Sequence, residues 1–112
     1  MYLEKSLIVA REKGELLFEG LSQVFLGRVM AEGAIAERSQ ATAEIWQGTQ
    51  LLESLHLRVF AAVGHLFLGQ VYLLKGDVIN GRAHLETARN VLTEVDEEYW
   101  LYKAQEALAS LK

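Results

Sequence analysis

The sequence of 112 residues contains no cysteine and no proline. Without cysteine, disulfides, thiolate zinc sites and cysteine nucleophiles are all excluded. The absence of proline, together with abundant alanine, leucine and glutamate, predicts helices throughout the chain. In a helical chain the nine glycines must be either helix ends or points where helices pack closely.

Positive charge is also scarce in this sequence. Eleven Lys and Arg residues stand against fifteen Asp and Glu residues, which gives a net charge of −4. A nucleic-acid surface needs clustered positive charge to bind phosphates. We therefore expect no nucleic-acid partner.

A long apolar run extends over residues 59–74 and contains His65 and Gln70. It is too short for a membrane-spanning helix, which needs about 20 mostly apolar residues. Charged residues interrupt the N-terminal stretch, so the hydrophobic core of a signal peptide is missing there. We expect a cytoplasmic protein without a membrane segment.

Apolar residues recur at helical spacing along the whole chain and predict six helices joined by short turns. Neighbours joined by such short turns lie antiparallel. Gly14, Gly33 and Gly76 are expected to end helices, and Asp77 and Asp96 to cap the helices that follow. The predicted helices cover residues 2–13, 15–32, 35–54, 56–75, 78–94 and 97–111.

Two stretches of the sequence resemble each other. FLGRVM at residues 25–30 returns as FLGQVY at residues 67–72. The helices that follow them match as well: Ala41, Ile45, Gly48, Leu52 and Leu55 correspond to Gly81, Leu85, Ala88, Leu92 and Val95. The chain is therefore predicted to contain two copies of one helical hairpin.

The second copy resembles a tetratricopeptide repeat. The matching positions are Leu68, Gly69, Tyr72, Gly76, Asp77, Gly81, Leu85 and Ala88. The first copy matches at Leu26, Gly27, Ala41 and Gly48. It has Met30 in place of the aromatic residue and lacks the glycine-aspartate turn, and both copies lack the usual proline. The glycines at 27 and 69 are expected to let paired helices approach, and those at 48 and 81, with Ala88, to let hairpins stack.

The resemblance implies an all-α solenoid of antiparallel helical hairpins. It divides the chain into a half-repeat at 2–13, repeats at 15–54 and 56–95, and a capping helix at 97–111. Because the chain starts in mid-repeat, we expect it to be a fragment of a longer protein. The sequence also resembles the helical C-terminal regions of large bacterial multidomain regulators, such as ATPase-coupled transcriptional activators and nucleotide cyclases.

The histidines and tryptophans form no recognisable catalytic or metal-binding motif. His56, His65 and His84 do not have the four-residue spacing of a helical metal pair. His65 is expected to pack in the core and His84 to lie on the outer side of its helix. Trp46 and Trp100 are interpreted as core residues. We expect no enzyme activity, no cofactor and no metal.

The first helix of each hairpin lines a concave groove in tetratricopeptide proteins. The positions implied by counting from the leucine-glycine pairs include Val24, Arg28, Leu66, Gln70, Leu73 and Leu74. None is a lysine or asparagine, which disfavours the carboxylate clamp that some family members have. We predict a protein-protein interaction module that binds an apolar or amphipathic segment, with Arg28 and Gln70 as polar anchors.

Two other functions stay open at this point. The chain could be a regulatory or sensory arm of a larger bacterial signalling or transcription regulator. In that case the apolar groove would serve self-association and the isolated fragment would form a homodimer. An enzyme is the third possibility, and it would require a pocket lined by ionisable groups.

Overall fold

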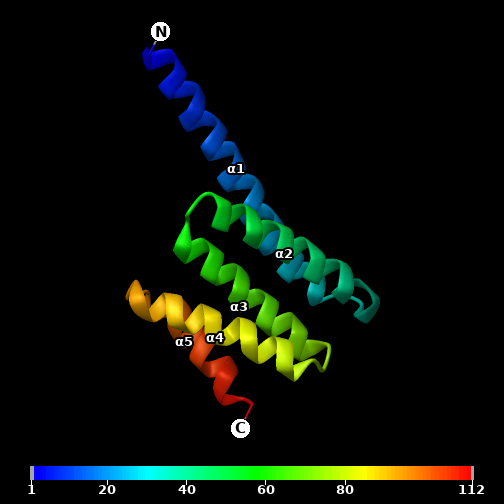
Figure 1. The fold of residues 1–112 in the computed structure, drawn as a ribbon. Coiled ribbons are helices and arrows are strands. Elements are labelled where there is room, and N and C mark those ends of the chain that lie inside the picture. Colours follow the sequence, from blue (N-terminus) through cyan, green and yellow to red (C-terminus); the bar gives the residue numbers. More distant parts are fainter. Residues whose placement is uncertain (1, 112) are drawn as a thin grey trace.

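The computed structural model describes residues 2–111, and the side chains of residues 12–111. This part of the chain consists of five α-helices and one short 3-10 turn, without a strand, which confirms the predicted all-α class (Figure 1). None of these helices combines the length and hydropathy needed to cross a membrane. The elements are α1 (Tyr2–Ala31), η1 (Ile35–Glu37), α2 (Arg38–Ser54), α3 (Arg58–Leu74), α4 (Val78–Glu94) and α5 (Glu98–Ala109).

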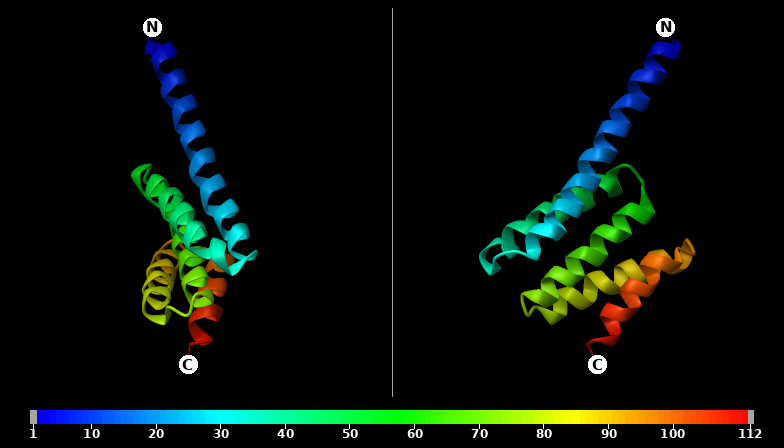
Figure 2. Two further views of the ribbon diagram at one scale, coloured as in Figure 1. Left: turned by 90° about the vertical axis from the view of Figure 1, so that its right-hand side faces the viewer. Right: turned by 180° about the vertical axis from the view of Figure 1, so that it is seen from behind.

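The helices pack in chain order as antiparallel neighbours (Figure 1). Helix α1 pairs with α2 and α3 with α4, while α2 also packs on α3 and α4 on α5. Contacts of α3 with both α1 and α5 bring these three helices to one side of the molecule, and α2 and α4 form the other (Figure 2). The N-terminal half of α1 extends beyond the other helices.

Helix α1 is continuous where two helices were predicted. Gly14 lies inside it, without the positive φ that marks the turn at Gly76. Glycine in a helix interior costs only about 1 kcal/mol relative to alanine, and no other turn residue supports a break at this point. The prediction of six helices is therefore wrong, because residues 2–13 and 15–31 form one helix.

The three turns between α2 and α5 share one geometry. Their central residues, His56, Gly76 and Asp96, have φ values of 58°, 83° and 56°. The next N–H group donates to the carbonyl five residues earlier, in the pairs Leu57–Leu52, Asp77–Tyr72 and Glu97–Leu92, at 3.1, 2.9 and 3.0 Å. This is the Schellman pattern, which ends a helix with a residue in the left-handed conformation. Each turn therefore reverses the chain in the same way.

The predicted caps are correct at one turn and wrong at another. Asp77 caps α4, because its Oδ1 accepts a hydrogen bond from the Asn80 N–H at 3.1 Å. A second bond, from the Asn80 side-chain amide, helps to hold the pKa of Asp77 below its usual value. Asp96 does not cap α5: it occupies the left-handed position of the turn, and Glu97 is the N-cap without a side-chain bond.

Two glycines set the distance between the helices of each hairpin. A Cβ at Gly27 of α1 would lie 2.7 Å from Cγ1 of Ile45 in α2. A Cβ at Gly69 of α3 would lie 2.5 Å from Cγ of Leu85 in α4. Both distances are shorter than carbon atoms tolerate, so only a hydrogen atom fits. The two hairpins are thus packed through the same contact, at positions that correspond in the sequence repeat.

The contact between the two hairpins uses a different glycine from those expected. A Cβ at Gly64 of α3 would overlap Oγ1 of Thr49 in α2. Thr49 is fully buried, and its hydroxyl donates to the Ile45 carbonyl at 2.7 Å. Gly48 and Gly81 lie inside their hairpins instead, where added Cβ atoms would meet the carbonyl oxygen of Gly20 and the side chain of Leu73. The expectation that these two glycines let hairpins stack is wrong.

The core lies between α1 to α4, and α5 adds the fully buried Ala104. The other repeat positions differ in their burial: Leu68, Ala41 and Ala88 are buried and Tyr72 is partly buried, whereas Leu26 is 64% exposed on α1. The largest fully buried apolar side chains are Val24, Ile45, Leu52, Leu66, Leu68, Val71, Leu85 and Leu92.

We predict opposite effects of alanine at two helical glycines. Gly69→Ala should lower the free energy of unfolding by about 1–3 kcal/mol, because the new methyl group overlaps Leu85. Gly14→Ala should raise it by about 0.5–1 kcal/mol, because its Cβ would meet nothing within 4 Å and alanine favours the helix. Urea denaturation followed by circular dichroism measures both. Equal effects of the two substitutions would contradict the packing role of Gly69.

Candidate functional site

A groove opens where α1, α3 and α5 meet, and it has a volume of about 340 Å³. We call it the α1–α3–α5 groove. Its lining residues are Arg28, Val29 and Glu32 from α1 and the turn after it, Leu66, Phe67 and Gln70 from α3, and Trp100 and Lys103 from α5. Because α1 and α5 both pack on α3, the side chains of three helices reach one hollow.

The two predicted polar anchors are joined in this groove. Arg28 donates from Nε to the Oε1 of Gln70 at 3.0 Å, across the α1–α3 contact. Its Nη1 also donates to Oε1 of Glu32 at 2.7 Å, one turn along the chain. The guanidinium is therefore held in place by two acceptors on different segments. Binding of a partner by this pair stays a prediction.

Three aromatic rings form one wall beside the groove. Phe25 and Phe67 meet edge to face at a centroid distance of 5.1 Å, and Phe67 meets Trp100 in the same way at 5.8 Å. Edge-to-face pairs stabilise by about 0.5–1.5 kcal/mol beyond their burial. Phe25 is still 43% exposed. Trp100 also packs against the core, as predicted, but sequence reasoning missed its contact with Phe67 at the groove.

The remaining predicted groove residues are divided between the core and the surface. Val24 is fully buried and packs on Gly48 of α2, and Leu66 is fully buried at the floor of the groove. Leu73 packs over Gly81 inside the α3–α4 hairpin. Leu74 is 42% exposed at the end of α3, away from the groove lining. The structure therefore brings Arg28, Leu66 and Gln70 together and leaves Val24, Leu73 and Leu74 outside.

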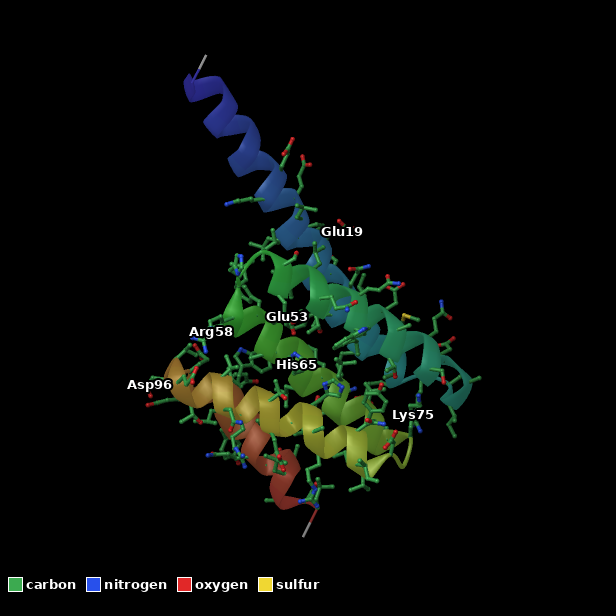
Figure 3. All side chains as sticks on the ribbon, in the orientation of Figure 1. Glu19, Glu53, Arg58, His65, Lys75 and Asp96 are labelled. Carbon is green, nitrogen blue, oxygen red and sulfur yellow. The ribbon has the colours of Figure 1, made fainter. Side chains whose placement is uncertain are left out.

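A hydrogen-bonded chain of three side chains links α2, α3 and α4 on the other side of the molecule. The carboxylate of Glu53 lies 2.6 Å from Nε2 of His65, and Nδ1 of His65 lies 3.0 Å from Nδ1 of His84. Figure 3 shows Glu53 and His65 among the side chains on these helices. We call this the Glu53–His65–His84 chain.

The two histidine rings meet through a hydrogen bond in the plane of the rings. Their planes differ by only 22° and their centroids lie 5.2 Å apart. The Nδ1 atoms lie 3.0 Å apart, and each Nδ1 lies one ring radius from the centre of its own ring. The centroid distance is close to the sum of these three lengths. The nitrogen atoms therefore lie nearly on the line that joins the ring centres, as a direct N–H···N bond requires.

When both rings are neutral, the acceptor at the start of this chain fixes the protons of both histidines. An ionised carboxylate can only accept, so His65 carries its proton on Nε2 and, when neutral, accepts at Nδ1. His84 must then donate from Nδ1, which leaves its Nε2 without a proton. The ring of His84 is thus held as one tautomer with a basic nitrogen at its far side.

His84 does not lie on the outer side of its helix as predicted. It is partly buried, its ring is parallel to that of Tyr72 at 5.5 Å, and Trp46 lies at 5.9 Å. The turn at Gly76 folds α4 back on α3, which brings His84 opposite residues near His65. Pairing residues across that predicted turn would have revealed the contact from the sequence.

A second hollow, also of about 340 Å³, lies next to His84 between α2 and the α3–α4 hairpin. We call it the aromatic pocket. Its lining residues are Ser39, Thr42, Ala43 and Trp46 of α2, Tyr72 and Lys75 at the end of α3, and His84 of α4. Trp46 was assigned to the core, but it is 40% exposed and forms part of the pocket wall.

No family model, curated protein or solved structure matches this chain. Among the side chains of residues 12–111, no group of three or more histidine, aspartate or glutamate residues could hold a metal ion. What the chain does is therefore inferred from its groove and its pocket.

We predict that the protein loses stability on mild acidification. Burial lowers the pKa of His84, His65 next to it lowers it further, and Glu53 partly opposes this. The unfolded chain therefore takes up a proton near pH 6.5, before the folded protein does. The free energy of unfolding should fall as the pH drops through about 6.5, and it should continue to fall until the folded protein also takes up the proton.

Urea denaturation at several pH values measures this dependence, and His84→Gln provides the control. The variant has no titrating group at this position, so its urea midpoint should fall less steeply with pH. Equal slopes for the two proteins would show that His84 does not cause the pH dependence.

Proposed function

We propose that the chain is a non-enzymatic protein-protein interaction module, built as a tetratricopeptide-like solenoid. Two observations support this architecture. The contacts of Gly27 with Ile45 and of Gly69 with Leu85 are equivalent in the two hairpins. The three turns that follow α2, α3 and α4 also have the same hydrogen bonds. Repeated hairpins of this kind stack side by side and offer an extended surface to partners.

The partner that we propose is an amphipathic helix that lies in the α1–α3–α5 groove. The observation that carries this proposal is exposed apolar surface at a hollow with a rigid aromatic wall. Val29 is 67% exposed at the groove, and Phe25 is 43% exposed in the wall. Apolar patches rimmed by polar residues mark interaction sites, and a groove between helices suits a helix with apolar anchors along one face.

The charges at the groove favour a partner helix with acidic residues beside its apolar face. Lys103 lies at the α5 edge, and it forms no ion pair among the described side chains. Arg28 contributes a second cation at the α1 edge, partly neutralised by Glu32. Charges at the rim of an interface mainly set specificity and the rate of association. A carboxylate on the partner would therefore face Lys103.

A designed peptide tests this groove. The probe is a fluorescein-labelled helical peptide with leucines on one face and glutamates on both sides of that face. We predict that it binds the wild-type chain and that Val29→Glu weakens binding about tenfold or more, because a carboxylate would then lie against the apolar face. Fluorescence anisotropy measures the affinity.

Ile79→Glu is the matched control for this experiment. Ile79 is 84% exposed on α4 and outside the groove lining, so the same substitution should leave peptide binding unchanged. Both variants should keep the helix content of the wild type, because both side chains point to solvent. Equal affinity of the peptide for all three proteins, or no binding to any, would refute the proposed groove.

Self-association is the second candidate function, as expected for an arm of a larger bacterial signalling or transcription regulator. Phe18 favours it, since this ring is 74% exposed on α1. It lies two turns before Phe25 on the same helix face, so an apolar line continues from the groove along α1. A second copy of the chain could cover this line and form a homodimer.

We predict that Phe18→Glu abolishes any dimer of the isolated chain. The substitution places a charge in an interface that would otherwise bury the ring, while the monomer has no contact to lose at so exposed a position. Sedimentation equilibrium of the wild type, Phe18→Glu and Ile79→Glu measures the mass. A wild-type monomer, or a dimer that persists in Phe18→Glu, would exclude this interface.

A further inference from the structure

We propose that the aromatic pocket binds a small aromatic acid whose ring carries a hydroxyl or N–H group. This site is separate from the α1–α3–α5 groove, and it uses polar groups that the interaction module leaves free. In the bound state the carboxylate of the ligand pairs with Lys75, its ring lies against Trp46 and Tyr72, and its donor group bonds to Nε2 of His84.

Nε2 of His84 is the hydrogen-bond acceptor that this ligand requires. With both histidines neutral, the Glu53–His65–His84 chain places the proton of His84 on Nδ1, so Nε2 is an unprotonated acceptor. No protein donor bonds to Nε2 among the described residues, and no buried side-chain nitrogen or oxygen there lacks a partner. Nε2 therefore reaches solvent, and His84 meets solvent at the aromatic pocket.

The rings around the pocket favour a planar ligand. Tyr72 and His84 lie parallel, with an angle of 2° between their planes, and present neighbouring rings from α3 and α4. Trp46 approaches from α2, with its ring inclined at 64° to that of His84. Aromatic ligands gain from both offset-stacked and edge-to-face contacts, and this pocket offers both. Because a hydrogen bond to His65 holds His84, the ring of His84 is in place before a ligand enters.

The charge at the pocket selects an anion. Lys75 is the one lining residue with a full charge at neutral pH, and no carboxylate lines the pocket among the described residues. Its ammonium lies 5.4 Å from the centre of the Tyr72 ring, so it is held next to the aromatic wall. A ligand carboxylate at the mouth would pair with it. The hydroxyl of Ser39, also in the lining, can donate a second bond to the same carboxylate.

The size of the pocket limits the ligand to one ring with a short acidic side chain. A volume of about 340 Å³ lies at the small end of ligand sites, which cover about 300–1,000 Å³. A larger fused ring system would not fit inside the pocket and would lose the contact with His84. We therefore choose 4-hydroxyphenylacetate as the probe, since it combines a single ring, a carboxylate and a phenolic donor.

The two tryptophans provide a direct test by NMR. Trp46 lines the aromatic pocket, whereas Trp100 lines the groove on the other side of the molecule. Addition of 4-hydroxyphenylacetate should shift the indole N–H signal of Trp46 and leave that of Trp100 in place. Phenylacetate, which lacks the donor, and 4-hydroxyphenylacetamide, which lacks the charge, should each bind more weakly.

Three variants separate the proposed contacts. Lys75→Met should weaken binding of the acid about tenfold or more and leave the weak binding of the amide unchanged. His84→Phe should keep a ring in the wall but remove the difference between hydroxyphenylacetate and phenylacetate. Lys103→Met removes a cation at the groove and should change nothing. No shift of the Trp46 signal at millimolar ligand, or equal binding to Lys75→Met and the wild type, would overturn the proposal.

Discussion

Close approach of helix backbones at glycines is the constraint on which the rest of this structure depends. At Gly27 and Gly69 the side chains of Ile45 and Leu85 occupy the place where a Cβ would be, and at Gly64 the buried Thr49 does the same. Close packing leaves few alternative arrangements, because a change of even one methylene group in a filled core changes the stability. These contacts fix how far apart α1 to α4 lie. The groove and the pocket are two of the spaces that remain at the edges of this packing.

The regular turns place successive helices on opposite sides of the molecule, which gives two separate surfaces. Each Schellman turn reverses the chain in the same way, so alternate helices come to the same side of the molecule. Side chains of α1, α3 and α5 meet at the groove, whereas α2, α3 and α4 meet at the aromatic pocket. Residues that are distant in sequence, such as Phe25 and Trp100, become neighbours through this alternation.

The sequence predicted the helical class, the close helix contacts at Gly27 and Gly69 and the cap at Asp77, because periodicity and turn residues are local signals. It failed at Gly14, where a glycine was interpreted as a helix end although the helix continues. The site was predicted less well. Arg28 and Gln70 were predicted from their places in the proposed repeat, and they lie together at one groove, but the burial of Val24 depends on packing against α2, which no local pattern encodes.

Helix α3 has to be apolar on nearly every side because it is packed by α2, α4, α1 and α5 in turn. Its two polar interior residues, His65 and Gln70, therefore need explanation, since an unpaired buried polar group costs about 1–3 kcal/mol. Each is bonded, and each lies where one of the two surfaces begins: Gln70 joins Arg28 at the groove, and His65 joins His84 next to the aromatic pocket. A purely structural helix could have been leucine at both positions. His65 and Gln70 lie at the edge of the core, next to the aromatic pocket and the groove. The same helix therefore supports both surfaces, while its apolar side chains hold the hairpins together.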